Sequence, residues 1–168
     1  LQKAQKLGYA ESDPTFDING IDAAHKLSIL SAIAFDIDAN LSDIFVEGIS
    51  EIELIDLMYA ETLGYKIKLL GMSQIKNNNI FNFVYPCLID LRESIANVDG
   101  VYNGIVVESD FCNKSFFQGE GAGSNPTATS VFSDIINISN NYSNKLRNPK
   151  EKKKNQDISE RFGSYYLR

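Results

Sequence analysis

Two runs of alternating residues decide the predicted fold: Tyr65-Lys66-Ile67-Lys68-Leu69-Leu70 and Ile80-Phe81-Asn82-Phe83-Val84-Tyr85-Pro86-Cys87-Leu88. In the first run apolar residues alternate with lysines, and in the second run aromatic residues recur at every second position. A period of two residues is typical of β-strands. Asn77-Asn78-Asn79 stands between the runs and predicts a turn. The two runs therefore predict a β-hairpin.

Helices are predicted both before and after this hairpin in the sequence. The stretch from Gly20 to Phe35 predicts a long helix with Asn19 as its N-cap, preceded by a loop over residues 9–19. Its apolar residues lie on most sides, so we expect it to be buried on most sides. The other predicted elements are a short strand at 42–49, a helix at 51–63, a strand pair at 101–108 and 115–118, and a helix at 126–141.

This order of elements predicts an α+β fold with a mixed, largely hairpin-built sheet and helices packed on one face. In the last helix, the stripe expected to be buried consists of Ala128, Val131, Ile135 and Ile138.

Composition narrows the classes of function. The chain has 168 residues, of which 43% are hydrophobic, so it can bury a core within one domain. Its net charge of −6 argues against a nucleic-acid partner or a membrane surface as partner. No apolar run reaches the ~18 residues that cross a bilayer. Cys87 and Cys112 fit neither a metal site nor a disulfide framework, which predicts free thiols, a cytoplasmic protein and no metal.

Both ends of the chain suggest a piece of a longer protein. The first residue is not Met, and residues 1–7 have the pattern of the end of a helix stopped by Gly8. Residues 144–161 are rich in lysine and asparagine and predict a solvated linker. Strand character returns over residues 162–168, where we expect a second domain to begin.

The best candidate site lies in Gly8-Tyr9-Ala10-Glu11-Ser12-Asp13-Pro14 and Gly20-Ile21-Asp22-Ala23-Ala24-His25-Lys26. Asp22 and Lys26 are four residues apart and therefore share one face of the predicted helix. Glu11 precedes a proline turn that can bring it toward that face. If the three converge, both charges of a small zwitterion find partners, which points to an amino-acid-binding site. The spacing alone favours a second interpretation, in which Asp22 complements the helix dipole and Lys26 is its i+4 partner.

A glycine-rich segment precedes the last predicted helix: Gln118-Gly119-Glu120-Gly121-Ala122-Gly123-Ser124-Asn125-Pro126-Thr127. The free N–H groups at a helix start can hold a phosphate. The spacing is not that of the dinucleotide fingerprint. A plain turn, with Ser124 or Asn125 as the helix cap and Pro126 in the first turn, is the alternative interpretation.

Four segments together resemble the homoserine dehydrogenase family: the stretch from Leu7 to Leu27, Val46-Glu47-Gly48-Ile49, Leu63-Gly64-Tyr65-Lys66-Ile67-Lys68-Leu69, and Gly121-Ala122-Gly123 with Pro126-Thr127-Ala128. The resemblance covers roughly residues 1 to 140. The family reduces L-aspartate 4-semialdehyde to L-homoserine with NADPH or NADH, on the route to threonine, methionine and isoleucine. The resemblance thus implies an NAD(P)-dependent oxidoreductase.

The resemblance also implies a domain plan. Residues 1–143 would form the substrate-binding, catalytic and dimerisation domain, 144–161 a linker, and 162–168 the start of a truncated ACT-like domain. The N-terminal Rossmann domain, which binds most of the dinucleotide, has no counterpart here. We therefore expect a homodimer or homotetramer in the parent enzyme, and no turnover by these residues alone.

By the same resemblance, Lys26 takes the position of the catalytic lysine. Glu11 and Asp22 would hold the amino end of the substrate, with Tyr9 beside them, and Gly123 would touch the cofactor. Two alternatives without catalysis stay open. One is an amino-acid-binding regulatory module, and the other is a dimerisation unit that uses the apolar row of Phe81, Phe83 and Tyr85.

Overall fold

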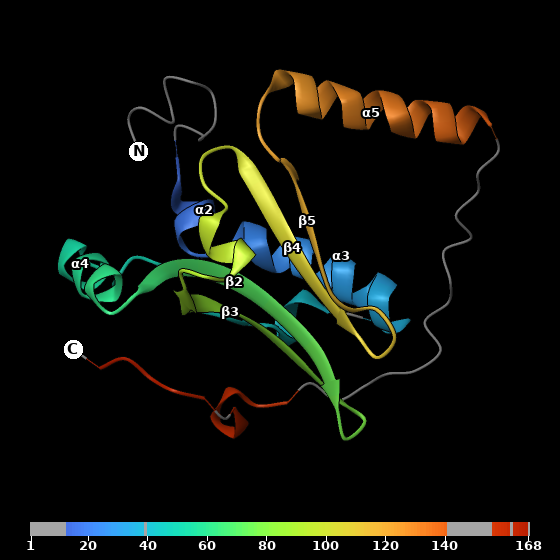
Figure 1. Ribbon diagram of the computed structural model, residues 1–168. Coiled ribbons are helices and arrows are strands. Elements are labelled where there is room, and N and C mark those ends of the chain that lie inside the picture. Colours follow the sequence, from blue (N-terminus) through green and yellow to red (C-terminus); the bar gives the residue numbers. More distant parts are fainter. Residues whose placement is uncertain (1–12, 39, 141–155, 162, 168) are drawn as a thin grey trace. The chain divides into compact units, whose positions relative to one another are not determined.

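The computed structural model describes residues 13–38, 40–140, 156–161 and 163–167 (Figure 1). The described residues form two compact units. The larger contains residues 13–89 together with the described part of 156–167, and the smaller contains residues 90–140. Helices and small sheets alternate along the chain, so the predicted α+β class is confirmed. The two hairpins belong to separate sheets.

The larger unit is built on a three-stranded sheet with the strand order β1-β3-β2. Strand β2 (Tyr65–Lys76) and strand β3 (Asn79–Asp90) form the predicted hairpin. Asn77 and Asn78 connect them with positive φ angles of 51° and 61°, the backbone of a type I′ turn. The short strand β1 (Phe45–Val46) runs parallel to β3.

The helices of the larger unit pack against β2. Helix α3 (Ile21–Phe35) and helix α4 (Leu54–Thr62) both contact this strand. A short helix, α2 (Thr15–Ile18), precedes α3, and the 3-10 turn η1 (Leu41–Asp43) follows it. None of the helices in the described part of the chain has the length and apolar character needed to cross a bilayer.

Two local predictions about this region were wrong. Residues 9–19 were predicted to be a loop, but Thr15–Ile18 form a helical turn. The N-cap of α3 is Gly20 and not Asn19. The reason is that the chain turns sharply between α2 and α3, with Gly20 at a φ of 77°, a conformation that glycine adopts without strain.

The core of the larger unit lies between α3 and the sheet. Its buried side chains are Ala24, Leu27, Ile44 and Val84, with Leu69 and Val46 packed against them. The alternation of β2 and β3 sends the aromatic row to the opposite face of the hairpin, as expected for residues of opposite parity.

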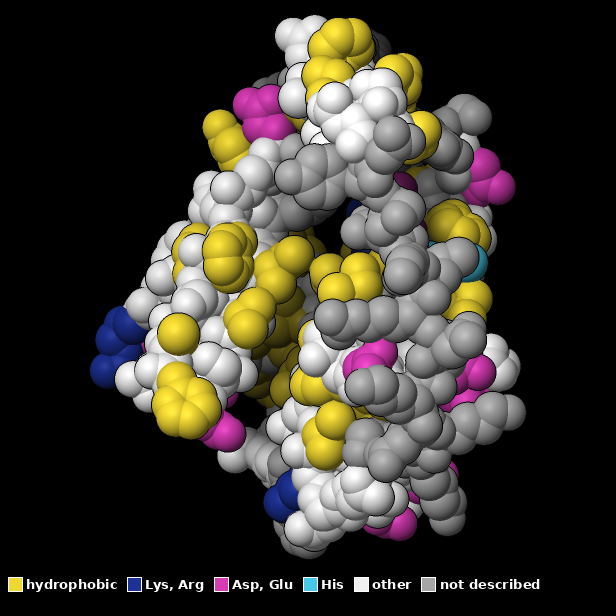
Figure 2. Space-filling view, turned by 90° about the vertical axis from the view of Figure 1, so that its right-hand side faces the viewer, with side chains coloured by type: hydrophobic (Ala, Val, Ile, Leu, Met, Phe, Trp, Pro, Cys, Tyr) yellow, Lys and Arg dark blue, Asp and Glu magenta, His cyan; other side chains and the backbone are white. Residues whose placement is uncertain are grey.

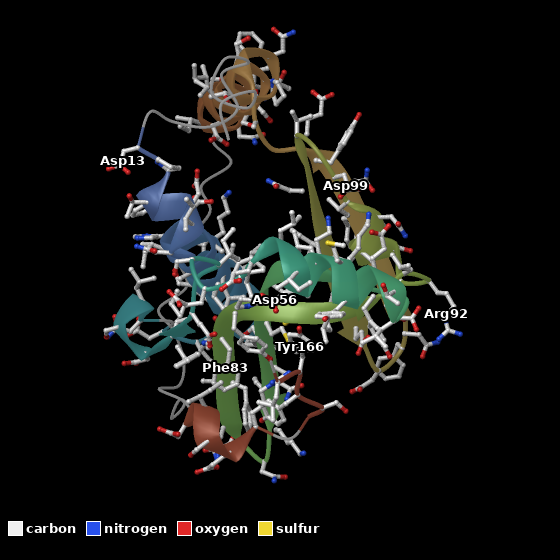
Figure 3. All side chains as sticks on the ribbon, turned by 90° about the vertical axis from the view of Figure 1, so that its left-hand side faces the viewer. Asp13, Asp56, Phe83, Arg92, Asp99 and Tyr166 are labelled. Carbon is white, nitrogen blue, oxygen red and sulfur yellow. The ribbon has the colours of Figure 1, made fainter. Side chains whose placement is uncertain are left out.

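Residues from the C-terminal part of the chain, among them Glu160 and Arg161, lie against that opposite face. The N–H of Gln156 donates to the carbonyl of Ile80 at 2.8 Å, and the 3-10 turn η3 (Ile158–Glu160) follows. The hydroxyl of Tyr166 donates to the buried carboxylate of Asp56 at 3.0 Å (Figure 3). Residues 156–161, predicted as the end of a solvated linker, thus contact the hairpin.

The remaining domain boundaries stay predictions. Residues 163–167 form no regular element in the described structure. Residues 144–155 of the predicted linker and the predicted helix end at residues 1–7 lie outside the described residues.

The smaller unit consists of a hairpin and a helix. Strands β4 (Tyr102–Ser109) and β5 (Asn113–Glu120) pair antiparallel, preceded by the 3-10 turn η2 (Ser94–Asn97) and followed by helix α5 (Ser124–Ser139). The apolar stripe of α5 is exposed, contrary to expectation: Val131 is 55% and Ile138 74% accessible. Hydrophobic side chains are visible at the top of the view in Figure 2, where α5 lies.

The two cysteines are free thiols, as predicted, but their surroundings differ. Cys87 lies half-buried on β3, and this burial raises the pKa of its thiol to about 11. Cys112 is exposed in the turn between β4 and β5. A raised pKa leaves less thiolate, so at pH 8 roughly one Cys87 side chain in a thousand is ionised.

We expect alkylation by iodoacetamide at pH 8 to modify Cys112 first, with Cys87 reacting at least about tenfold more slowly because only the thiolate attacks. Peptide mass spectrometry over a time course measures both rates. In a Cys112→Ser variant, Cys87 should react slowly in buffer and rapidly in urea. Equal rates for the two native thiols would contradict the burial of Cys87.

A second prediction concerns Gly48, where the chain passes very close to the α2–α3 turn. A Cβ atom there would lie 2.6 Å from the Cα of Asn19 and closer still to the carbonyl oxygen of Ile18. Backbone atoms cannot move aside as a flexible side chain does. We expect Gly48→Ala to lower the free energy of unfolding by about 3 kcal/mol, the upper end of overpacking costs.

Urea unfolding of the protein measures the change. The matched control is Gly71→Ala in strand β2, where a Cβ would meet Leu27 side-chain atoms at ordinary distances of 3.4–3.6 Å. This control should shift the free energy by less than about 1 kcal/mol, because alanine suits a strand better than glycine. Similar effects of the two substitutions would refute the close approach at Gly48.

Candidate functional site

The candidate site begins with an ion pair on the first turns of α3. The Nζ of Lys26 lies 2.6 Å from the Oδ2 of Asp22, and the two side chains are 59% and 39% exposed. Exposed pairs of this spacing contribute only about 0.3–0.5 kcal/mol to stability. The lysine and the carboxylate can therefore exchange partners with a bound ligand at little cost to the fold.

The surrounding backbone holds the start of α3 in place. The N–H of Ile49 donates to the carbonyl of Ile18 at 2.8 Å, which ties the end of α2 to the segment after β1. Gly20 completes the turn, and a Cβ on it would press on Val46 and Val84 at 3.2 Å. The position of Asp22 and Lys26 thus follows from backbone contacts that only small residues permit.

Asp13 shapes the beginning of α2. Its Oδ1 accepts hydrogen bonds from the N–H of Thr15 at 3.0 Å and from the Thr15 hydroxyl at 2.5 Å. These bonds favour the ionised form and hold the pKa of the Asp13 carboxyl below its usual range. His25 is exposed on α3, and its ring centroid lies 5.6 Å from that of Phe16.

Of the predicted site residues, the structure brings Asp22 and Lys26 together. Tyr9 and Glu11 lie outside the described residues. Gly123 belongs to the smaller unit. Of the two carboxylates and the lysine expected to converge, the structure describes Asp22 and Lys26 as a pair. That Glu11 joins them stays a prediction.

Gly123 stands at the start of α5, the other predicted contact point. It is the N-cap of the helix, with a φ of 115°, and in the described structure no side chain caps the first turn, which also holds no acidic residue. The cap predicted at Ser124 or Asn125 is therefore wrong, because both residues already belong to the helix. Uncapped N–H groups at a helix start suit an anion such as the phosphate of a dinucleotide.

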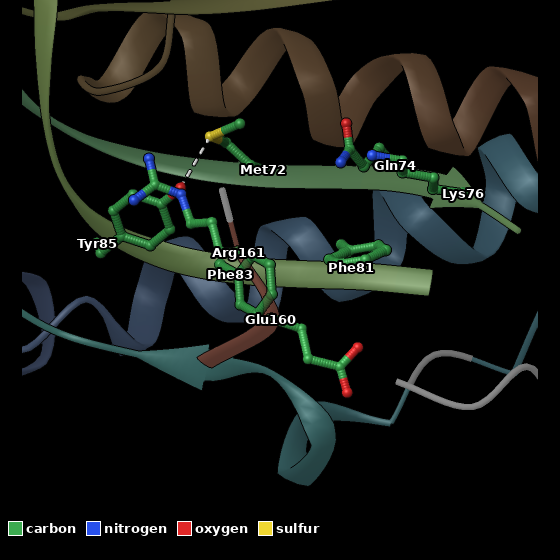
Figure 4. Close-up of a pocket in the computed structure, with 8 residues that line it drawn as sticks. All are labelled: Met72, Gln74, Lys76, Phe81, Phe83, Tyr85, Glu160 and Arg161. Atoms are coloured by element: carbon green, nitrogen blue, oxygen red, sulfur yellow. Dashed lines mark hydrogen bonds between the residues drawn. The ribbon is translucent and has the colours of Figure 1, made fainter. Parts of the chain in front are cut away.

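A pocket of about 220 Å³ lies on the face of the β2–β3 hairpin that carries the aromatic row (Figure 4). Arg161 stacks over the ring of Tyr85 with its Cζ 4.5 Å from the ring centroid. Phe83 and Tyr85 are only 3% and 6% exposed, so this row is not the open apolar face expected for dimerisation. The pocket is lined by Met72, Gln74, Lys76, Phe81, Phe83, Tyr85, Glu160 and Arg161.

The pocket could not be predicted from the sequence, because two of its lining residues come from the segment after residue 155, more than 70 positions beyond the hairpin turn. Burial among these neighbours is the main cause that raises the pKa of the Tyr85 hydroxyl, while the Arg161 guanidinium opposes it. The sequence did contain an indication of this contact, since a row of aromatic residues with no predicted partner is expected to be buried by another segment of the chain.

The comparisons with known proteins agree on one family. A family model described as homoserine dehydrogenase matches residues 1–136. The homoserine dehydrogenase of Neisseria gonorrhoeae is 49% identical over 138 residues, which make up 82% of this chain and 32% of that protein. The Bacillus subtilis relative of the same name is 36% identical over 173 residues, covering 100% of this chain and 40% of that protein.

Solved structures give the same result. A homoserine dehydrogenase from Thiobacillus denitrificans superimposes with a TM-score of 0.77 at 48% identity, covering 87% of this chain and 35% of that one. A hyperthermophilic archaeal homoserine dehydrogenase, solved in complex with NADPH, has a TM-score of 0.60 at 27% identity and covers 82% of this chain. The chain spans about a third of the length of several curated relatives that it matches.

Proposed function

Because this chain belongs to the homoserine dehydrogenase family, we propose that it is the substrate-binding part of an oxidoreductase that interconverts L-homoserine and L-aspartate 4-semialdehyde. The observation that carries this proposal is the ion pair between Lys26 and Asp22 on α3. It presents both signs of charge, half-exposed, to a substrate that itself carries both.

Lys26 is the proposed acid of the reduction. When the aldehyde is reduced, its oxygen becomes an alkoxide and needs a proton. A lysine ammonium can donate that proton from Nζ as a general acid. In the reverse direction the neutral amine accepts the proton of the alcohol. The exposure of the Lys26 side chain supports this role, because the ammonium can reach a bound substrate.

Asp22 and Glu11 are the proposed partners of the substrate ammonium. Asp22 lies close enough to Lys26 to hold the lysine side chain, and its second oxygen remains able to accept a further hydrogen bond from a ligand. We assign Glu11 to the substrate ammonium and Tyr9 to a position beside it. Two carboxylates and one ammonium would then match the charges of a single amino acid.

The proposed cofactor is NADPH or NADH, which supplies the hydride. Gly123 and the uncapped first turn of α5 are compatible with a phosphate-bearing ligand, because the N–H groups there lack side-chain partners in the described structure. The relative solved with NADPH supports a nicotinamide cofactor for this family. Most of the dinucleotide would be bound by parts of the enzyme that these residues do not include.

The rest of the proposal concerns the whole enzyme. We place it in the cytoplasm, in the biosynthesis of threonine, methionine and isoleucine, as a homodimer or homotetramer. We propose that residues 1–168 alone do not turn over substrate, because they correspond to only about a third of the length of a related homoserine dehydrogenase. The exposed apolar stripe of α5 supports this view, since such a stripe is usually covered in a complete protein.

In the full-length enzyme, we expect Lys26→Ala to lower kcat by about 10²–10⁴-fold, the usual contribution of a general acid, with a much smaller change in KM for homoserine. Steady-state kinetics in both directions measures the effect. The matched control is Lys114→Ala, because Lys114 is also half-exposed and paired with a carboxylate, that of Glu93. The control should keep kcat within twofold. Wild-type turnover by Lys26→Ala would rule out the assignment.

For the cofactor, we expect Gly123→Ala to raise KM for NADPH by about tenfold while KM for homoserine changes by less than twofold. The cause is a φ of 115°, which side chains rarely adopt and which would shift the start of α5. Gly119→Ala on β5 is the control, because among the described residues no heavy atom beyond its chain neighbours lies within 4 Å of its Cβ position. An unchanged KM for NADPH in Gly123→Ala would remove Gly123 from the cofactor site.

A further inference from the structure

Helix α3 buries Ala24, Leu27 and Ser31 but leaves the large apolar residues Ile29 and Ile33 exposed. Ala24 and Ser31 are each 1% exposed and Leu27 is 7% exposed. In contrast, Ile29 is 61% and Ile33 74% exposed. Hydrophobic burial favours the largest apolar side chains, so burial alone does not explain why this side of α3 faces the sheet.

A polar cluster between α3 and the hairpin accounts for which side of the helix faces the sheet. The hydroxyl of Ser31 donates to the Oγ of Ser73 at 2.8 Å and lies 3.1 Å from the Oδ1 of Asn82. The hydroxyl of Ser73 donates to the same Oδ1 at 2.5 Å. Asn82 is 3% exposed, so the cluster joins the helix to both strands within the core.

Such a cluster tolerates little movement of the helix. A hydrogen bond between two hydroxyl groups requires a donor–acceptor distance of about 2.5–3.0 Å and a nearly linear angle, whereas apolar contacts have no such directional requirement. Turning α3 by one residue would rotate it by about 100° and leave the buried Ser31 hydroxyl without its present partners, Ser73 and Asn82. Leaving such groups unpaired in a core costs more than misplacing a methyl group.

The rotation of α3 determines the direction of Lys26. Ser31 follows Lys26 by five residues, which places the two side chains about 140° apart around the helix axis. When Ser31 points at the hairpin, Lys26 and Asp22 point away from it, and both are indeed partly exposed. A different rotation would bring the ion pair toward the apolar core or turn it from its substrate.

We propose that Ser31, Ser73 and Asn82 form an orientation lock, in which the Ser31 hydroxyl sets the rotation of α3 and thereby positions Lys26 for proton transfer. These three are positioning residues, since none of them lies in the proposed substrate site. The inference rests on the proposed function of Lys26. It adds residues from β2 and β3 that the sequence did not connect with the reaction.

The test uses Ser31→Ala in the full-length enzyme. This substitution removes the hydrogen bonds from α3 to the cluster, keeps the Ser73–Asn82 bond and suits a helix. We expect kcat to fall about tenfold, with KM for homoserine changed by less than threefold, because misplacement of a catalytic group affects mainly the transition state. The folded fraction, measured by near-ultraviolet circular dichroism at the assay temperature, corrects kcat for unfolded protein.

Ser28→Ala is the matched control. Ser28 lies on the same helix, but its hydroxyl donates to the carbonyl of His25 within α3 and not to the sheet. The control should keep kcat within twofold. A second variant, Asn82→Leu, removes the shared acceptor from β3 and should lower the corrected kcat in the same way.

A double-mutant cycle separates positioning of Lys26 from a general structural effect. In a Lys26→Arg background, in which the cation is retained but the lysine is absent, the kcat penalty of Ser31→Ala should shrink at least threefold. An equal penalty in both backgrounds would overturn the inference. So would a corrected kcat within twofold of wild type for both Ser31→Ala and Asn82→Leu.

These outcomes are distinct from a failure of the proposed function. If Lys26→Ala abolishes turnover while the lock variants are fully active, the lysine keeps its role and the lock is refuted. If Lys26→Ala is fully active, both the proposed role of Lys26 and the proposed orientation lock are refuted.

Discussion

The packing of α3 on the β2–β3 hairpin is the contact on which the larger unit depends. It forms the core around Leu27 and Val84, and it requires glycine at two crowded positions. Gly20 turns the chain with a left-handed backbone, and Gly48 passes against the turn without a side chain. Because Gly20 lies against the side chains of Val46 and Val84 and Gly48 against the backbone of the α2–α3 turn, the position of the helix start can vary little.

The hairpin serves a different purpose on each face. Toward α3 it presents the buried oxygen atoms of Ser73 and Asn82 among apolar neighbours. On the other face, its aromatic row accepts Arg161 and other residues of the C-terminal segment. The hydrogen bond from Tyr166 to Asp56 extends this covering to α4, where Asp56 also accepts the N–H of Glu53. One sheet therefore supports both the candidate site and the end of the chain.

The two units differ in how far their apolar side chains are buried. The larger one has a buried core, while in the smaller one the described apolar side chains of α5 are largely accessible. The helix that carries Asp22 and Lys26, proposed to bind the substrate, belongs to the first unit, and the helix start proposed for the cofactor belongs to the second. This division fits a family whose members are about three times as long as this chain. It also fits an enzyme whose substrate and cofactor are held by separate parts.

The sequence by itself determined the α+β class, the strands of both hairpins, the extent of α3 and the family, because period-two alternation, turn residues and a long motif are local properties of the chain. It also placed Asp22 and Lys26 on one helix face, since their spacing alone decides that. Only the tertiary structure decided which face of α3 meets the sheet. It also decided that Arg161 covers Tyr85, because both depend on contacts between residues far apart in the chain. A helix with apolar residues on most sides does not reveal its buried face, and a polar cluster becomes specific only when its three members meet.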